Sequence, residues 1–385
     1  MRIAYFSDTY LPNKDGVVSQ ILASKAALES RGHYVHVFST GSRSDIKFNK
    51  SDASVTIYTG LKFPLYKEYK VALFPHSSVM YSFAKDLEIV HSHAVASMGF
   101  PAIATAKALN LPLVGTFHTL LPNAMHYLTR NKRAQLVLSK ATWSAIDAFY
   151  LPFDLVTAPS KAIADLMDEN GIHDVKVVSN GLDLAKYNPR VTGRDEIRRK
   201  LGIKPSDKVG AFVGRVVEEK NIDVLVHAAN VIIREMPEFR LLICGDGPDL
   251  ARIKKLVKYL NLQKYVIFTG YVPYSEIQHY FAAADVCLTA STFETQCISL
   301  LEGLACGLPA VAANSLALPE AVKNKYNGYL FEAGDVEDCS SKIIKVLGAS
   351  QKEYSKLKSN SWEKAQGYSI ENVCDKWEKI YRDLI

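Results

Sequence analysis

The sequence lacks any long hydrophobic run. None of its apolar segments approaches the roughly 20 residues that a membrane-spanning helix needs. The first residues, Met1 to Asp8, reach a carboxylate too early for a signal peptide and have the composition of a buried strand. With 48% hydrophobic and 22% charged residues over 385 positions, the composition favours a soluble, cytoplasmic protein of about two domains.

Cysteine is also scarce, and none of it is arranged as a metal-binding pair. The six cysteines all lie in the second half of the chain, and no two have the C-x2-C spacing of a zinc site. Several sit inside apolar segments, where cysteine behaves as a small hydrophobic residue. We therefore expect no zinc site and a reducing compartment. The six are Cys244, Cys287, Cys297, Cys306, Cys339 and Cys374.

Acidic residues are absent between Glu88 and Asp147, although the net charge of the chain is only +6. Two interpretations stay open for this segment, a solvated helix face or a surface for anionic partners. Aromatic and basic residues are not interleaved as in nucleic-acid-binding modules, so we expect a membrane surface and no nucleic acid. The basic residues of the segment are Lys107, Arg130, Lys132, Arg133 and Lys140.

Short apolar runs alternate with amphipathic stretches along the whole chain, which predicts an α/β protein with parallel sheets covered by helices. Near residues 183–206 the periodicity is lost and proline and glycine appear. We expect two doubly wound domains facing across a cleft, over residues 1–185 and 186–368. The amphipathic segment 369–385 is expected to cross back to the first domain. The expected strands are 3–7, 33–39, 89–93, 113–117, 155–158, 209–213, 240–244, 266–269, 286–289 and 309–312.

Two carboxylates, Glu294 and Glu302, flank the predicted start of an apolar helix and are separated by seven residues. A helix N-terminus offers unpaired N–H groups to an anion, and flanking carboxylates accept hydrogen bonds from hydroxyls. This combination suits a sugar nucleotide. Two surface glutamates would have the same spacing, so the pair alone does not decide.

Two cations occupy the predicted strand-to-helix loop around Gly214. Arg215 and Lys220 flank the start of a helix and are suited to a diphosphate, although ordinary surface cations would look the same. Gly245 and Gly247 follow the next strand and permit close backbone approach.

Together these motifs, in this order, resemble the retaining glycosyltransferases of family 4, which have the GT-B fold. The resemblance covers nearly the whole chain. Besides the residues above, it rests on Asn180-Gly-Leu-Asp183, Thr269-Gly270, Ala305-Cys-Gly-Leu-Pro309, Pro319-Glu320 and Asn327-Gly-Tyr-Leu-Phe331.

The resemblance implies a role for each matching residue. Arg215 and Lys220 would grip the donor diphosphate, Glu294 would contact the transferred sugar, and Glu302 would bind the ribose. His118 matches a histidine beside the donor sugar, while His91 and His93 are either structural or functional. The expected donor-binding residues are Gly16, Val17, Gly214, Gly245, Gly247, Tyr271, Gln296, Cys297, Ile298 and Glu302.

Some motifs are most similar to those of glucosyltransferases that act on glycerolipids with a UDP-sugar, among them Glu294-Thr-Gln296. Two departures leave the acceptor open. Cys297 replaces a usual glycine, and Asn123 lies where lipid-directed members often have an acidic residue. The expected acceptor-side residues are Asp8, Tyr10, Asn123, Tyr127 and Arg130.

The expected reaction transfers a hexose, most simply glucose, with retention. It needs no metal and no other cofactor, since Arg215 and Lys220 stabilise the leaving diphosphate and the nucleotide-sugar is a co-substrate. A soluble or polyprenyl-linked saccharide acceptor with a UDP- or GDP-sugar is the alternative within this class. A sugar-nucleotide epimerase or a non-catalytic nucleotide-sugar-binding protein is the alternative outside it. The oligomeric state stays open.

Overall fold

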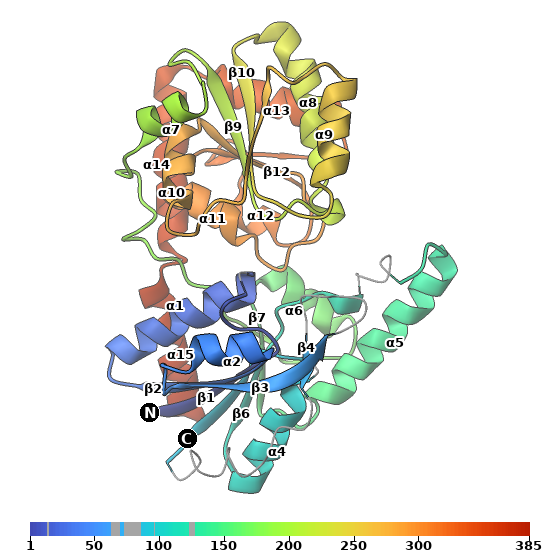
Figure 1. Cartoon of the computed structure of the whole chain (residues 1–385), viewed down its shortest axis with the longest axis vertical. Coiled ribbons are helices and arrows are strands. Elements are labelled where there is room, and N and C mark those ends of the chain that lie inside the picture. The colour runs from blue at the N-terminus through green and yellow to red at the C-terminus, as the bar shows by residue number, and fades with distance from the viewer. Residues whose placement is uncertain (14, 63–69, 73–85, 96, 123–127) are drawn as a thin grey trace. The chain divides into compact units, whose positions relative to one another are not determined.

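The computed structural model describes residues 1–13, 15–62, 70–72, 86–95, 97–122 and 128–385. These residues form two compact units (Figure 1). The first unit contains Met1–Gly181 and Ile370–Ile385, and the second contains Leu182–Ser369. Each unit has its own sheet and its own hydrophobic core.

The first unit is built on an eight-stranded sheet in the order β4-β3-β2-β1-β5-β6-β7-β8. All neighbouring strands are parallel except β3 and β4. Strands β1, β5 and β6 are wholly or almost wholly buried, as expected for a sheet covered by helices on both faces. The strands are β1 (Arg2–Ser7), β2 (Tyr34–Gly41), β3 (Val55–Lys62), β4 (Lys70–Ala72), β5 (Ile89–Ser92), β6 (Leu113–Thr116), β7 (Leu155–Ala158) and β8 (Lys176–Val177).

The helices of the first unit include one from the far end of the sequence. Helix α15 (Ile370–Leu384), red in Figure 1, lies beside the blue helix α1 (Gly16–Ser30). Its buried face, which includes Trp377 and Tyr381, belongs to the same core as Ile3 and Tyr5 of β1. The other helices are α2 (Arg43–Asn49), α4 (Gly99–Leu109), α5 (Lys132–Tyr150) and α6 (Lys161–Asp168).

The second unit is built on a six-stranded, fully parallel sheet in the order β11-β10-β9-β12-β13-β14. Its strands are β9 (Lys208–Val213), β10 (Phe239–Cys244), β11 (Val266–Gly270), β12 (Val286–Thr289), β13 (Ala310–Ala313) and β14 (Gly328–Phe331). Its helices are α7 (Arg194–Lys200), α8 (Ile222–Glu235), α9 (Leu250–Tyr259), α10 (Ile277–Ala283), α11 (Ile298–Ala305), α12 (Leu318–Ala321), α13 (Val336–Leu347) and α14 (Gln351–Gln366), with a short 3₁₀ turn at Glu218–Lys220.

Both sheets reverse their strand order once. The reversal lies between β1 and β5 in the first unit and between β9 and β12 in the second. Ligands of open α/β sheets bind outside the carboxyl ends of the strands at such a switch point. The predicted pair of doubly wound units is confirmed, and the two switch points are where a site is expected in each unit.

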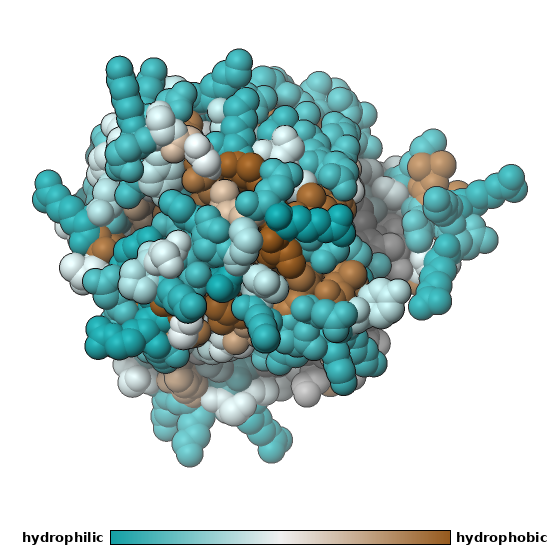
Figure 2. All heavy atoms as spheres, turned by 90° about the horizontal axis from the view of Figure 1, so that it is seen from above, coloured by the Kyte–Doolittle hydropathy of each residue, from teal (hydrophilic) through white to brown (hydrophobic). Residues whose placement is uncertain are grey.

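Within the described residues, no helix is both long enough and apolar enough to cross a membrane. The face of the molecule seen in Figure 2 is mostly hydrophilic, and its apolar areas are interrupted by polar side chains.

Candidate active site

At the switch point of the second sheet, two predicted site residues meet in an ion pair. The loop after β9 carries Lys220, and the loop after β12 carries Glu294. The Lys220 ammonium donates a hydrogen bond of 2.5 Å to Glu294 Oε1. Both side chains are largely shielded, with exposures of 21% for Lys220 and 9% for Glu294. The structure thus brings together two residues that lie 74 positions apart.

Asn221 explains how the sequence holds these two loops together. Its backbone adopts the left-handed conformation, with φ of 46°, which asparagine tolerates better than most residues. Its side-chain amide donates to the Ala290 carbonyl and to the Thr292 hydroxyl, both at 3.1 Å. The Thr292 amide in turn donates to the Glu219 carbonyl. The Lys220 loop is therefore fixed to the Glu294 loop by the residue next to the lysine.

The electrostatics of the pair favour a charged lysine. Burial alone would lower the pKa of Lys220, but the neighbouring Glu294 carboxylate outweighs it and the pKa is raised. Arg215 follows Gly214 at the end of β9 and is exposed. The site therefore holds a shielded cation and an exposed cation on the same loop.

The second predicted carboxylate, Glu302, lies inside helix α11. The helix begins at Ile298, so Glu294 precedes it by four residues and only Glu302 is on it. The polar segment 294–297 is irregular, so Glu294 lies in the loop just before the helix and the two carboxylates flank its start, as the sequence predicts. Glu302 is 4% exposed.

Burial raises the pKa of Glu302 to about 7. The Tyr187 hydroxyl, the Lys186 ammonium and the Tyr274 hydroxyl oppose this shift, because they favour the carboxylate. Lys186 also lies over the Tyr274 ring, 3.1 Å from its centroid, and donates to the Tyr274 carbonyl at 2.5 Å. Burial therefore favours the neutral form of Glu302, whereas its three polar neighbours favour the carboxylate form.

Tyr187, Lys186 and Tyr274 were not identified from the sequence. Tyr187 is fully buried, and its hydroxyl has no hydrogen-bond partner of normal geometry among the described residues. The irregular segment after Asp183 carries no periodic pattern, so nothing in it marked these side chains. The only signal for Lys186 and Tyr187 was their position beside the Asn180-Gly-Leu-Asp183 motif, and the only signal for Tyr274 was its position near Tyr271.

The predicted glycines lie where the backbones after β9 and β10 touch. A Cβ atom on Gly245 would lie 1.8 Å from the Gly214 carbonyl oxygen, and one on Gly247 would lie 2.3 Å from the Val216 oxygen. The amides of Gly214 and Val216 donate to the carbonyls of Cys244 and Asp246. Any side chain at these two glycines would separate the loops.

The other donor-side residues occupy neighbouring loops of the second unit. Tyr271 follows β11 and is 51% exposed. Gln296 and Cys297 directly precede α11, and Ile298 is its first residue. Cys297 is 8% exposed, and burial raises the pKa of its thiol to about 12. All six cysteines are buried and free, as their apolar contexts predict.

In the first unit, the predicted residues follow β1. Asp8 accepts a 2.7 Å hydrogen bond from the Met98 amide, and burial raises its pKa to about 6. Tyr10 packs in the hydrophobic core at 3% exposure, so it offers little surface to an acceptor. Gly16 and Val17 form the first turn of α1, whose N-cap is the Asp15 carboxylate.

Three histidines lie at the ends of β5 and β6, beside the switch point of the first sheet. His93 Nδ1 and His118 Nε2 are 2.9 Å apart. The rings of His91 and His93 have centroids 4.1 Å apart. Burial lowers the pKa of His118 to about 4 and lowers those of His91 and His93 well below their usual value. The cluster is therefore uncharged at neutral pH.

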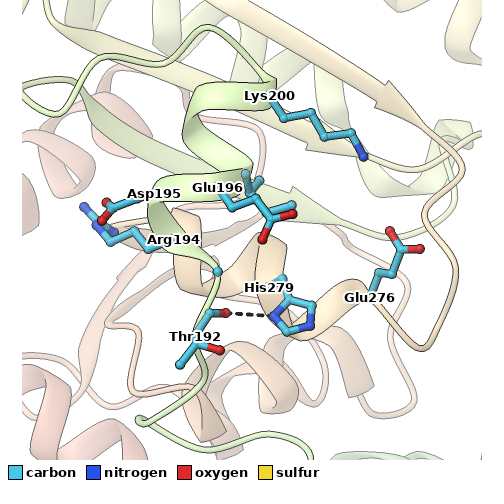
Figure 3. A pocket seen from close by; sticks show the side chains of 9 residues that line it. Thr192, Arg194, Asp195, Glu196, Lys200, Glu276 and His279 are labelled. Atoms are coloured by element: carbon cyan, nitrogen blue, oxygen red, sulfur yellow. Dashed lines mark hydrogen bonds between the residues drawn. The ribbon is translucent and has the colours of Figure 1, made fainter.

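The remaining acceptor-side predictions fall on or near residues that are not described. Asn123 and Tyr127 lie outside the described residues, and Arg130 is exposed just before α5. None of the predicted residues lines the open pocket of about 700 Å³ at α7, where His279 Nδ1 bonds the Thr192 carbonyl (Figure 3). In the described part of the chain, no cluster of three or more His, Cys, Asp or Glu side chains could hold a metal ion.

Comparison with known proteins identifies the family of this chain. Residues 14–186 match the family model described as Glycosyltransferase Family 4, and residues 193–364 match the one described as Glycosyl transferases group 1. An alpha-monoglucosyldiacylglycerol synthase of Streptococcus pneumoniae is 30% identical over 100% of this chain and 86% of its own length. The chain belongs to glycosyltransferase family 4.

Further similar proteins support this membership. An alpha-monoglucosyldiacylglycerol synthase of Acholeplasma laidlawii is 30% identical, and the match covers 100% of this chain and 98% of that one. Among solved structures, Anabaena HepE in complex with UDP-glucose aligns over 100% of both chains with a TM-score of 0.80 and 19% identity. This likeness identifies the fold of the family 4 enzyme as GT-B.

Proposed function

We propose that this glycosyltransferase moves a hexose, glucose in the simplest case, from a UDP-sugar to a membrane glycerolipid with retention of configuration. The observation that carries the proposal is the Lys220–Glu294 pair at the carboxyl ends of β9 and β12. The relatives named as glucosyldiacylglycerol synthases support the lipid acceptor and the sugar. The UDP-glucose complex of a protein with the same fold supports the donor.

The proposed chemistry uses charge that is already in place. As the bond between sugar and diphosphate breaks, negative charge grows on the leaving phosphate, and Arg215 and Lys220 would stabilise it. Glu294, which already accepts from Lys220, would accept a hydrogen bond from a hydroxyl of the transferred sugar. Glu302 would bind the ribose hydroxyls as a carboxylate. The acceptor proton would pass to the leaving phosphate on the same face of the sugar.

The acceptor side of the proposal rests on helix α5. No residue from Lys132 to Thr142 is buried, so the N-terminal half of the helix projects from its unit (Figure 1). Leu136 and Val137 are 59% and 66% exposed there. In Figure 2 the projecting end at the right combines apolar atoms with long hydrophilic side chains. The exposed cations beside them are Arg130, Lys132, Arg133 and Lys140.

We therefore propose that this end of α5 docks on an anionic membrane. Apolar side chains enter the interface between headgroups and acyl chains, while cations contact anionic headgroups. Docking would place the enzyme at the surface that contains its acceptor and make it a peripheral protein of the inner face.

The proposal is tested by incubating the enzyme with UDP-, GDP- and ADP-sugars and diacylglycerol in phosphatidylglycerol vesicles. We expect UDP release with UDP-glucose only when the lipid is present, and a glycolipid with an α-linked sugar by mass spectrometry and NMR. Conversion of the donor without an acceptor would indicate an epimerase instead. Transfer only to a soluble saccharide would contradict the lipid acceptor.

A further inference from the structure

The three buried histidines of the first unit differ in how completely their ring nitrogens are satisfied. His91 uses both nitrogens: Nδ1 bonds the Tyr381 hydroxyl of α15 and Nε2 bonds the Thr116 hydroxyl, each at 2.7 Å. Tyr381 and Thr116 are themselves buried. His91 is therefore a structural link between helix α15 and the sheet.

Only one ring nitrogen of His93 has a hydrogen-bond partner among the described residues. Its Nδ1 lies 2.9 Å from His118 Nε2, within hydrogen-bond distance. Its Nε2 is buried and has no hydrogen-bond partner among the described residues. The side chain is only 7% exposed, and its ring packs against Tyr5 with a centroid separation of 4.6 Å. One nitrogen of His93 therefore serves His118, and the other serves no protein group that the structure describes.

This asymmetry decides where the proton of His93 lies. Burial keeps all three rings neutral, so each carries one N–H group and one acceptor nitrogen. A proton on the unpartnered Nε2 would be a buried donor without an acceptor, and buried N–H groups without partners are rarer than under-used acceptors. The favoured state therefore has the proton on Nδ1 of His93, which donates it to His118.

We infer that His93 is a positioning residue that fixes the tautomer of His118. Because Nε2 of His118 accepts the hydrogen bond from His93, the single proton of the His118 ring must lie on Nδ1. In this tautomer Nδ1 of His118 can donate a hydrogen bond but cannot accept one, which limits the groups that His118 can bind to acceptors such as a hydroxyl or phosphate oxygen. This role rests on the proposed function, in which His118 lies beside the transferred sugar.

The tautomer can be measured without any substrate. In protein labelled with ¹⁵N-histidine, two-bond ¹H–¹⁵N correlations distinguish a ring protonated on Nδ1 from one protonated on Nε2. We expect the Nδ1–H form for both His93 and His118 in the wild type at pH 7.5. A His118 ring protonated on Nε2 would overturn the inference, whatever reaction the enzyme catalyses.

Two substitutions of His93 distinguish the effect of its hydrogen bond to His118 from the effect of its packing. His93→Asn places an amide near the position of Nδ1 and preserves a donor to His118. His93→Gln places its amide near the position of Nε2 and removes that donor. We expect the His118 Nδ1–H signal to persist in H93N and to give way to a tautomer mixture in H93Q. Persistence of a single Nδ1–H form in H93Q would show that His93 does not fix it.

Kinetics give the second measurement. We expect kcat of H93Q to fall about 10- to 100-fold below that of H93N, the size of effect seen when a hydrogen-bond partner that orients a metal-ligating histidine is lost. KM for the donor should change by less than about 3-fold between the two variants, since neither removes a diphosphate-binding group. Equal kcat values for H93N and H93Q would overturn the positioning role.

His36→Gln is the matched control for the loss of a buried imidazole. His36 lies on β2 and bonds the Thr56 hydroxyl at 2.9 Å, away from the ends of β5 and β6. We expect this variant to lose thermal stability without any change in the His118 signals. If the wild type transfers no sugar at all, the proposed function fails while the tautomer measurement still decides the role of His93.

Discussion

Arg215 and Lys220 share a loop, but their surroundings predict different responses to substitution. Arg215 is exposed, so Arg215→Ala should leave the melting temperature nearly unchanged. Its turnover should nevertheless fall at least 100-fold, because loss of one stabiliser of developing charge costs about 2.7–4 kcal/mol. Steady-state kinetics with the UDP-sugar, alongside thermal melts, measure both quantities. The control is Arg234→Ala, which removes an exposed arginine in the last turn of α8. We expect this variant to have unchanged kinetics.

Lys220→Ala should lower turnover and stability together. Removing the lysine leaves the Glu294 carboxylate buried without its partner, which costs about 3–5 kcal/mol in comparable pairs. The double variant Lys220→Met/Glu294→Gln should recover much of the stability but none of the activity. Near-normal turnover in both Arg215→Ala and Lys220→Ala would contradict the assignment of the diphosphate site.

Glu302 should destabilise the folded protein at neutral and alkaline pH. Its pKa is about 7 when folded, against an ordinary value of 4.5. Because the folded pKa is the higher one, its contribution to stability is complete below pH 4.5 and is lost as the pH rises through 7. The difference between the two values corresponds to about 3 kcal/mol.

We therefore expect Glu302→Gln to raise the free energy of unfolding at pH 8 but not at pH 4.5, as measured by urea titration. The same variant should weaken UDP binding about 10- to 100-fold, because hydrogen bonds to charged groups are worth about 1.5–3 kcal/mol. The control is Glu337→Gln, which neutralises an exposed carboxylate of α13. It should change neither the free energy of unfolding nor the binding of UDP. Equal stability of wild type and Glu302→Gln at pH 8 would show that the carboxylate carries no burial cost.

At the scale of elements, the most buried parallel strands could be predicted, whereas some of the more exposed strands could not. Strands β1, β5, β9 and β12 are short apolar runs, so periodicity found them within a residue or two. Strand β3 (Val55–Lys62) carries threonine and tyrosine among polar neighbours and was not predicted. The ion pair of Lys220 with Glu294 could not be predicted either, because it depends on the side-chain geometry of two separate loops. The burial of Glu302 could be deduced only after the position of helix α11 in the fold was known.

The projecting end of α5 gives a test at the same scale. Reversing Arg130, Lys132 and Arg133 to Glu should weaken binding to phosphatidylglycerol vesicles on the order of 100-fold, since each cation contributes about 1 kcal/mol. Wild-type binding should also weaken as salt rises. Flotation of vesicles with bound protein measures both effects. Reversing the exposed Lys254, Lys255 and Lys258 of α9 changes the net charge equally and is the matched control.

Two outcomes contradict the docking proposal. Wild-type protein that stays at the bottom of the flotation gradient would remove the membrane surface altogether. Equal loss of vesicle binding in the α5 and α9 variants would show that binding depends on the net charge of the protein and not on the position of the cations at α5. A further variant, Leu136→Ser/Val137→Ser, tests the apolar part of the surface without changing any charge.

At the scale of the whole molecule, the two units should differ in whether a continuous fragment can fold. The second unit is one continuous segment, Leu182–Ser369, with its own core. The first unit needs Ile370–Ile385, because α15 buries Val373, Trp377 and Tyr381 in its core. Each such side chain contributes about 1.5–3 kcal/mol, so losing several would consume a typical folding free energy of 5–15 kcal/mol.

We therefore expect fragment 182–369 to unfold cooperatively in circular dichroism melts and to bind UDP in calorimetry, with Arg215→Ala weakening that binding. Fragment 1–181 should show no cooperative transition, and joining residues 370–385 to it through a flexible linker should restore one. The reason is that α15 supplies part of the surface on which β1 and α1 pack, so the first sheet is incomplete without it. A cooperative melt of fragment 1–181 alone would show that this surface is dispensable. Binding of UDP to fragment 182–369 would place the nucleotide-binding groups within the second unit, where Arg215, Lys220 and Glu302 lie.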